Sequence, residues 1–174
     1  MFVLALLAAQ AVHVAPPTPE GHIHQAAPGT LTVCPVAPVV PRGLEGWRTM
    51  TPVAAARAPV AIGVGQGVRA TLLPQTEVTY SVAPAKPGAR GTSGGVFAFE
   101  VARAGRHRVA LAAGAWIDVV QGGRALPSKA HGHGPECSAI RKIVEFDLGP
   151  GRYLLQIAGS PFATLPLLIA RAEG

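Results

Sequence analysis

The fold is decided by the stretch Lys142-Ile143-Val144-Glu145-Phe146-Asp147-Leu148-Gly149-Pro150-Gly151-Arg152-Tyr153-Leu154-Leu155-Gln156-Ile157-Ala158. After Val144, charged and apolar residues alternate, which is the period of a strand with one buried face and one face in water. Gly149-Pro150-Gly151 has the composition of a tight turn. We therefore expect two consecutive strands, 141–148 and 152–158, joined by a turn.

Other segments share this β-branched content and alternation, and none shows a sustained helical period. They are 68–73, 77–82, 96–101, 106–112, 116–120 and 165–170. Gln121-Gly122-Gly123-Arg124 adds the paired glycines of a hairpin turn after 116–120. Strands of this length and spacing predict an all-β protein, a single jelly-roll-like β-sandwich of about eight short strands.

The first part of the 174-residue chain differs in composition from the rest. Phe2 to Ala9 is an unbroken apolar run, too short to cross a bilayer, and Ala9-Gln10-Ala11 matches a signal-peptidase site. We expect a signal peptide at 1–11, cut after residue 11 or residue 15, and an extended Pro/Ala-rich arm at 12–43. The sandwich would then occupy 44–174, with Trp47 as an anchor packed against it.

These features predict a periplasmic or secreted protein without a transmembrane anchor, which we expect to be a monomer. In the alternative interpretation, the apolar run is a buried first strand or helix. Lys and Arg number 15 against 9 Asp and Glu, but only Arg103, Arg106 and Arg108 cluster tightly, and aromatics make up 5% of the chain. Nucleic-acid binding is therefore not expected. A solvated basic surface, or one attracted to anionic glycans or membranes, fits this pattern.

The chain has two cysteines, Cys34 and Cys137, so an oxidising compartment favours a disulfide between them. Such a bond would close a loop of about a hundred residues and stabilise the fold by ~3–5 kcal/mol. It would also tie the arm to the histidine-rich segment 130–137. In the alternative interpretation, Cys137 is a thiolate metal ligand.

The segment Ala130-His131-Gly132-His133-Gly134-Pro135-Glu136-Cys137 gathers potential metal ligands. Two His at i and i+2 on an extended segment share a side, so His131 and His133 are candidate ligands, with Glu136 completing the set. The arm carries a second pair, His22 and His24, and four imidazoles would suit copper or zinc. In the alternative, the segment is a turn whose imidazoles cap backbone groups beside the disulfide.

Three phrases in the second half of the chain are similar to a known family: 104–111, 114–120 and 131–142. They resemble small exported proteins of sphingomonad-type bacteria, whose members often carry the name homogentisate 1,2-dioxygenase. The resemblance implies an iron(II) ion held by two His and one carboxylate. No histidine follows His133, so a third imidazole would come from His107, His22 or His24.

The predicted function is that of a non-enzymatic envelope binding or accessory module, with a transition-metal site on the His131/His133 loop as a hypothesis. The first alternative is the iron-dependent dioxygenase that the resemblance implies. The second is a carbohydrate-binding module: Trp116 is expected in the core, but an exposed Trp116 near the loop would provide a platform for sugar stacking. The partner would be an envelope component or a glycan. His107, inside Arg-His-Arg, is expected to be exposed.

Overall fold

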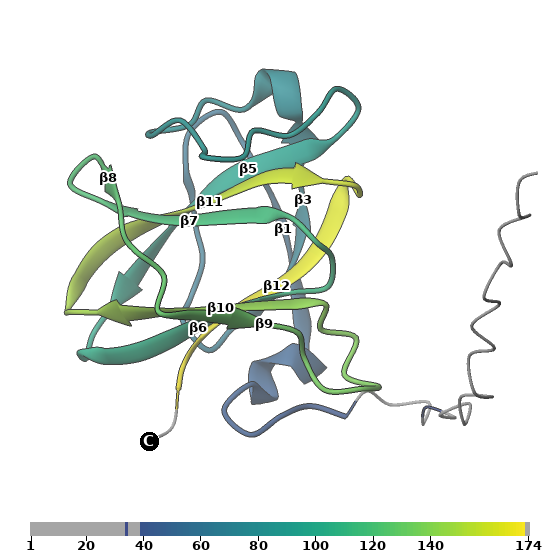
Figure 1. Ribbon diagram of the computed structural model, residues 1–174, viewed down its shortest axis with the longest axis vertical. Helices are drawn as coiled ribbons and strands as arrows, with labels where there is room; N and C mark the ends of the chain where they lie inside the picture. The colour runs from purple at the N-terminus through teal and green to yellow at the C-terminus, as the bar shows by residue number, and fades with distance from the viewer. Residues whose placement is uncertain (1–33, 35–38, 173–174) are drawn as a thin grey trace, which may run out of the picture. The chain divides into compact units, whose positions relative to one another are not determined.

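The computed structural model describes residue 34 and residues 39–172, and these form two β-sheets packed face to face (Figure 1). The predicted all-β sandwich is therefore confirmed. The first sheet has the strand order β1-β3-β12-β6-β10-β9 and the second has the order β2-β5-β11-β7-β8, with β4 paired to β5. The strands of the first sheet are Met50–Ala54 (β1), Gly67–Thr71 (β3), Gly105–Leu111 (β6), Ala130–Gly132 (β9), Lys142–Leu148 (β10) and Thr164–Arg171 (β12). Those of the second are Val60–Ala61 (β2), Leu73–Pro74 (β4), Ser93–Val101 (β5), Trp116–Gln121 (β7), Arg124–Ala125 (β8) and Gly151–Ser160 (β11).

The core lies between the sheets, because the long strands alternate buried and less buried residues as their sequences predict. In β10, Val144, Phe146 and Leu148 face inward, while Glu145 and Asp147 face outward. The inward residues of both sheets form one apolar cluster, which includes the stacked rings of Phe99 and Tyr153, 5.4 Å apart. This cluster holds the two sheets together.

A second, smaller apolar cluster covers the outer face of the first sheet. The 3₁₀ helix η1 (Glu45–Arg48) places Trp47 there, 5% exposed, against Ala110, Leu168 and Ala170. The predicted anchoring of Trp47 is confirmed. The close approach of η1 to β3 requires glycine at Gly67, since a Cβ at this residue would collide with the carbonyl oxygen of Gly46.

All but one of the predicted strand segments contain a strand, and the exception is 77–82. Its beginning belongs to the 3₁₀ helix η2 (Gln75–Glu77), and the rest runs over the second sheet without joining it. The reason is the buried side chain of Gln156 on β11. Its Oε1 accepts hydrogen bonds from the N–H groups of Ser81 and Val82, and its Nε2 donates to the Val82 carbonyl. The side chain of Gln156 thus provides the hydrogen bonds that this segment would otherwise make to a neighbouring strand.

The two predicted turns differ in what they connect. Gly122 and Gly123, at φ 57° and 73°, close a two-residue hairpin between β7 and β8, as predicted. Gly149-Pro150-Gly151, by contrast, carries the chain from one sheet to the other, because β10 pairs with β6 and β9 while β11 pairs with β5 and β7. The edge strands β1, β2, β8 and β9 were not predicted.

The predicted signal peptide at 1–11 and most of the arm at 12–43 lie outside the described residues. Within residues 39–172, no helix is long and apolar enough to cross a bilayer.

Candidate functional site

The predicted disulfide between Cys34 and Cys137 is confirmed, with a Cα–Cα distance of 5.2 Å. The sulfur of Cys137 is therefore not a thiolate ligand. The loop around it is held by short contacts: Val39 donates its N–H to the Cys137 carbonyl at 2.9 Å, and the Ser138 hydroxyl donates to the Pro135 carbonyl at 2.6 Å. Cys137 and Ala139 both adopt the left-handed backbone region, at φ 60° and 59°.

The two histidines of this segment occupy different settings. His131 lies on the edge strand β9 opposite Val144, whereas His133 follows the strand and its Nδ1 donates to the Arg141 carbonyl at 2.7 Å. His133 lines a shallow hollow with Ile143 and Glu145. His131 borders that hollow too, but it also borders a larger one beside Trp116. The His133 bond to backbone is the kind of contact that the turn interpretation predicts.

No three His, Cys, Asp or Glu side chains within residue 34 and residues 39–172 come close enough to hold one metal ion. A metal site on His131, His133 and Glu136 stays a prediction, and His22 and His24 lie outside the described residues.

The iron triad implied by the resemblance does not form among the described side chains. His107 was expected to be exposed, which is wrong: it is 2% exposed, and its Nδ1 donates to the Gly105 carbonyl at 3.0 Å. Arg106 and Arg108 take the outer face of β6 and form ion pairs with Glu145 on β10, so His107 between them faces inward.

Among the described residues, a candidate binding site is a hollow of about 540 Å³ where the two sheets meet at one edge, which we call the Trp116 pocket. One wall comes from β7 of the second sheet, the other from β10 of the first, and the crossing between β8 and β9 closes part of the rim. The lining residues are Lys86, Trp116, Ile117, Asp118, Leu126, Pro127, Ser128, His131, Lys142 and Val144.

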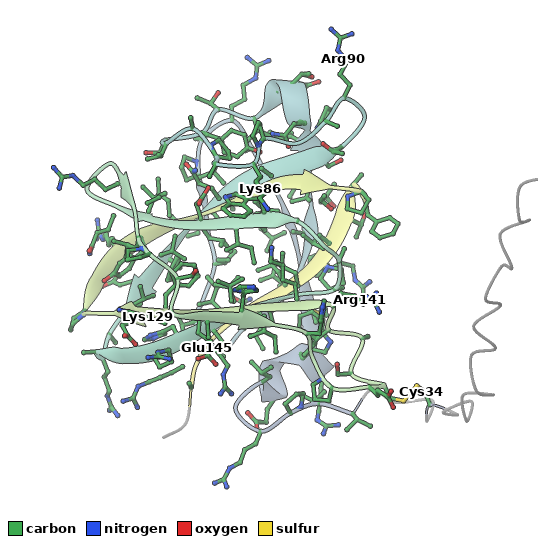
Figure 2. All side chains as sticks on the ribbon, in the orientation of Figure 1. Cys34, Lys86, Arg90, Lys129, Arg141 and Glu145 are labelled. Atoms are coloured by element: carbon green, nitrogen blue, oxygen red, sulfur yellow. A yellow bond between two sulfur atoms is a disulfide. The ribbon has the colours of Figure 1, made fainter. Side chains whose placement is uncertain are left out.

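Two ammonium groups lie over the Trp116 ring. Their nitrogens are 5.3 Å (Lys86) and 5.6 Å (Lys142) from the ring centroid, within the range of cation–π attraction. Lys86 lies beside β7 in Figure 2 and comes from the loop that Gln156 holds. Lys142 also donates to the Ala115 carbonyl at 2.6 Å. Burial lowers the pKa of Lys142, and the nearby charge of Lys86 lowers it further.

A carboxylate lies at the same ring. The indole Nε1 of Trp116 donates to Asp118 Oδ1 at 3.0 Å, which fixes the rotation of the ring. Burial raises the pKa of Asp118, and the indole hydrogen bond opposes that shift. The pocket thus combines an aromatic ring, two cations and a carboxylate, a set of groups suited to binding a polar ligand.

Trp116 and His131 were identified from the sequence as candidate site residues, whereas Lys86, Asp118 and Lys142 were not. Trp116 is half-buried, so it is neither a core residue nor an open platform. Lys86 sits in a Pro/Gly-rich stretch with no motif, and its approach to Trp116 depends on how the loop crosses the sheet. The one available signal was the scarcity of lysine: of the chain's three lysines, Lys86, Lys129 and Lys142, two meet here.

No family model and no curated protein matches the chain. Among solved structures, the pre-peptidase C-terminal domain of a collagenase from Bacillus anthracis is similar, at a TM-score of 0.42 and 16% sequence identity, over 66% of this chain and 96% of that one.

Proposed function

We propose that the protein is an exported, non-enzymatic binding module and that its ligand is a glycan held in the Trp116 pocket. The observation that carries the proposal is the half-buried indole at a pocket of about 540 Å³, surrounded by charged groups from two sheets and a loop. The Cys34–Cys137 disulfide supports export, because such bonds persist in oxidising compartments.

Sugar rings have an apolar C–H face and a rim of hydroxyl groups. The C–H face of a sugar can pack against the flat apolar surface of an indole, and Trp116, next to Leu126 and Pro127, provides such a surface. Asp118 accepts hydrogen bonds and the ammonium groups donate them, which meets the needs of the hydroxyls. Lys86 is exposed and reaches the ring from a loop, so its ammonium group can move off the ring face when a ligand enters and donate hydrogen bonds to that ligand instead.

Isothermal titration calorimetry of the purified protein with maltotriose, cellotriose, chitotriose and trigalacturonate tests this proposal. At least one trisaccharide should bind, and Trp116→Ala should weaken its affinity at least ~10-fold, equivalent to about 1.4 kcal/mol. Phe162→Ala is the matched control, because Phe162 is an aromatic residue that is 60% exposed and not part of the pocket. Circular dichroism should show that both variants keep the β-fold.

Absence of binding by all four trisaccharides would overturn the glycan proposal. So would wild-type affinity in the Trp116→Ala variant.

A further inference from the structure

We infer that the Trp116 pocket selects an acidic sugar, a uronate whose carboxylate pairs with the ammonium groups of Lys86 and Lys142. This inference rests on the proposed glycan function and narrows its ligand class. It follows from the position of the two ammonium groups at the Trp116 ring and from their lack of an ion-pair partner among the described residues.

The two lysines are like charges held near one another at one ring. Such a pair repels, and burial adds a desolvation penalty for the charge of Lys142. The cation–π contacts with Trp116 and the Lys142 bond to the Ala115 carbonyl hold the pair in place. An anion that pairs with the ammonium groups would weaken this repulsion and supply charge-assisted hydrogen bonds.

Neither ammonium group has an ion-pair partner in the part of the chain that the structure describes. The carboxylate in the pocket, Asp118, instead accepts the Trp116 indole N–H. On the outer face of β6 and β10, by contrast, Arg106 and Arg108 each form an ion pair with Glu145. The third lysine, Lys129, lies 3.9 Å from a carboxylate oxygen of Asp147. The charges of Lys86 and Lys142 are thus available to pair with an anionic group of a ligand.

The pocket's other groups favour a ring that carries the carboxylate over a free small anion. A volume of about 540 Å³ with apolar walls from Trp116, Leu126 and Val144 far exceeds what a bare anion fills. Asp118 would repel an anion placed beside it, so the ligand's carboxylate should lie next to the lysines and away from Asp118, which can accept hydrogen bonds from the ligand's hydroxyls. A uronate has both kinds of group on one ring.

The test compares trigalacturonate with its fully methyl-esterified form, which keeps the rings and loses the charges. Titrations at roughly 0.15 M salt screen exposed charges separated by more than ~8 Å. The acid should bind at least ~10-fold more tightly than the ester, and a Lys86→Met/Lys142→Met double variant should remove that difference. Methionine keeps an apolar stem, and circular dichroism checks the fold. Arg57→Met/Arg69→Met is the matched control, since it also removes two positive charges, from exposed residues outside the pocket.

The outcomes separate the two proposals. If the acid and the ester bind equally and Trp116→Ala abolishes both, the glycan function stands and the uronate inference falls. If the acid's preference survives in the double lysine variant, or is lost equally in Arg57→Met/Arg69→Met, the preference reflects the net charge of +6 and the inference is overturned. If neither ligand nor any neutral trisaccharide binds, the proposed function fails and the inference fails with it.

Discussion

The side-chain amide of Gln156 bonds to both polar backbone groups of Val82, accepting from its N–H at 3.1 Å and donating to its carbonyl at 2.9 Å. Gln156 is 1% exposed, so these bonds are shielded from water. Tyr80 adds a second tie, donating its hydroxyl to the Ile157 carbonyl at 3.0 Å. The side chains of Gln156 and Tyr80 thus fasten the loop that carries Lys86 onto the second sheet, and the Trp116 pocket depends on this attachment.

Replacing Gln156 with leucine should therefore destabilise the protein and loosen the pocket. The change keeps the volume but leaves the N–H groups of Ser81 and Val82 without their acceptor. We expect the free energy of unfolding to fall by about 2 kcal/mol, because each such loss is worth ~1–3 kcal/mol and water replaces part of it. Urea unfolding measures this change.

Hydrogen exchange at Ser81 and Val82 gives the local readout, and both amides should exchange faster. Gln121→Leu, at an exposed position at the end of β7, should change stability by less than ~0.5 kcal/mol. Slow exchange at Ser81 and Val82 in the Gln156→Leu protein would show that other contacts hold the loop.

Breaking the Cys34–Cys137 bond should lower stability by ~3–5 kcal/mol, because the bond closes a loop across a sequence separation of 103 residues in the unfolded chain. A Cys34→Ala/Cys137→Ala variant, unfolded in urea, measures the loss. Dithiothreitol should lower the urea midpoint of the wild-type protein to that of the variant, and it should leave the midpoint of the variant unchanged. A loss below about 1 kcal/mol would mean that the Val39–Cys137 hydrogen bond and the packing of η1 already hold this end of the chain.

The sequence predicted the long strands because their two-residue period is local, as in Lys142–Leu148 and Gly151–Ser160. The short edge strands have too few residues for a period, and pairing with a neighbour defines them. The loop after Glu77 has the alternation of a strand, yet its backbone bonds to the side chain of Gln156 instead of a neighbouring strand. Gln156 lies 74 residues beyond Val82 in the sequence, so no local pattern reveals this contact. The pocket was missed for the same reason: Lys86, Trp116 and Lys142 meet only after folding, and no local pattern links them.

The charged cluster on β6 and β10 should make stability depend on pH at the acidic end. Hydrogen bonds from Arg108 and Arg106 lower the pKa of Glu145 below its ordinary value of 4.5, and Arg106 lowers that of Asp147 below 3.8. A lowered folded-state pKa means that the stabilisation is fully present above the ordinary value and is lost as pH falls through the folded value. The contribution of this cluster to the urea midpoint should therefore be level above about pH 5 and decline below about pH 4.

Glu145→Gln separates this effect from general acid unfolding. Glu145 is half-buried at the protein surface, where solvent still screens its ion pairs with Arg106 and Arg108, so its share should be only ~0.5–1 kcal/mol at neutral pH. The variant should be less stable than wild type at pH 7, and the gap should narrow toward pH 3. A constant gap across the range would show that the charge of Glu145 is not responsible.

Ala139 adopts φ 59° beside the disulfide, in the left-handed region that residues with a Cβ disfavour by ~1–2 kcal/mol. Ala139→Gly removes this penalty but adds ~0.4–1 kcal/mol of unfolded-state entropy. The free energy of unfolding should therefore rise by about 0.5 kcal/mol, measured by urea unfolding. Ala125→Gly, on β8 with no positive φ, should lower it instead. If both glycine variants were destabilised equally, the loop at Ala139 would gain nothing from glycine's freedom, and the contacts of Ser138 and Ile140 would set its conformation.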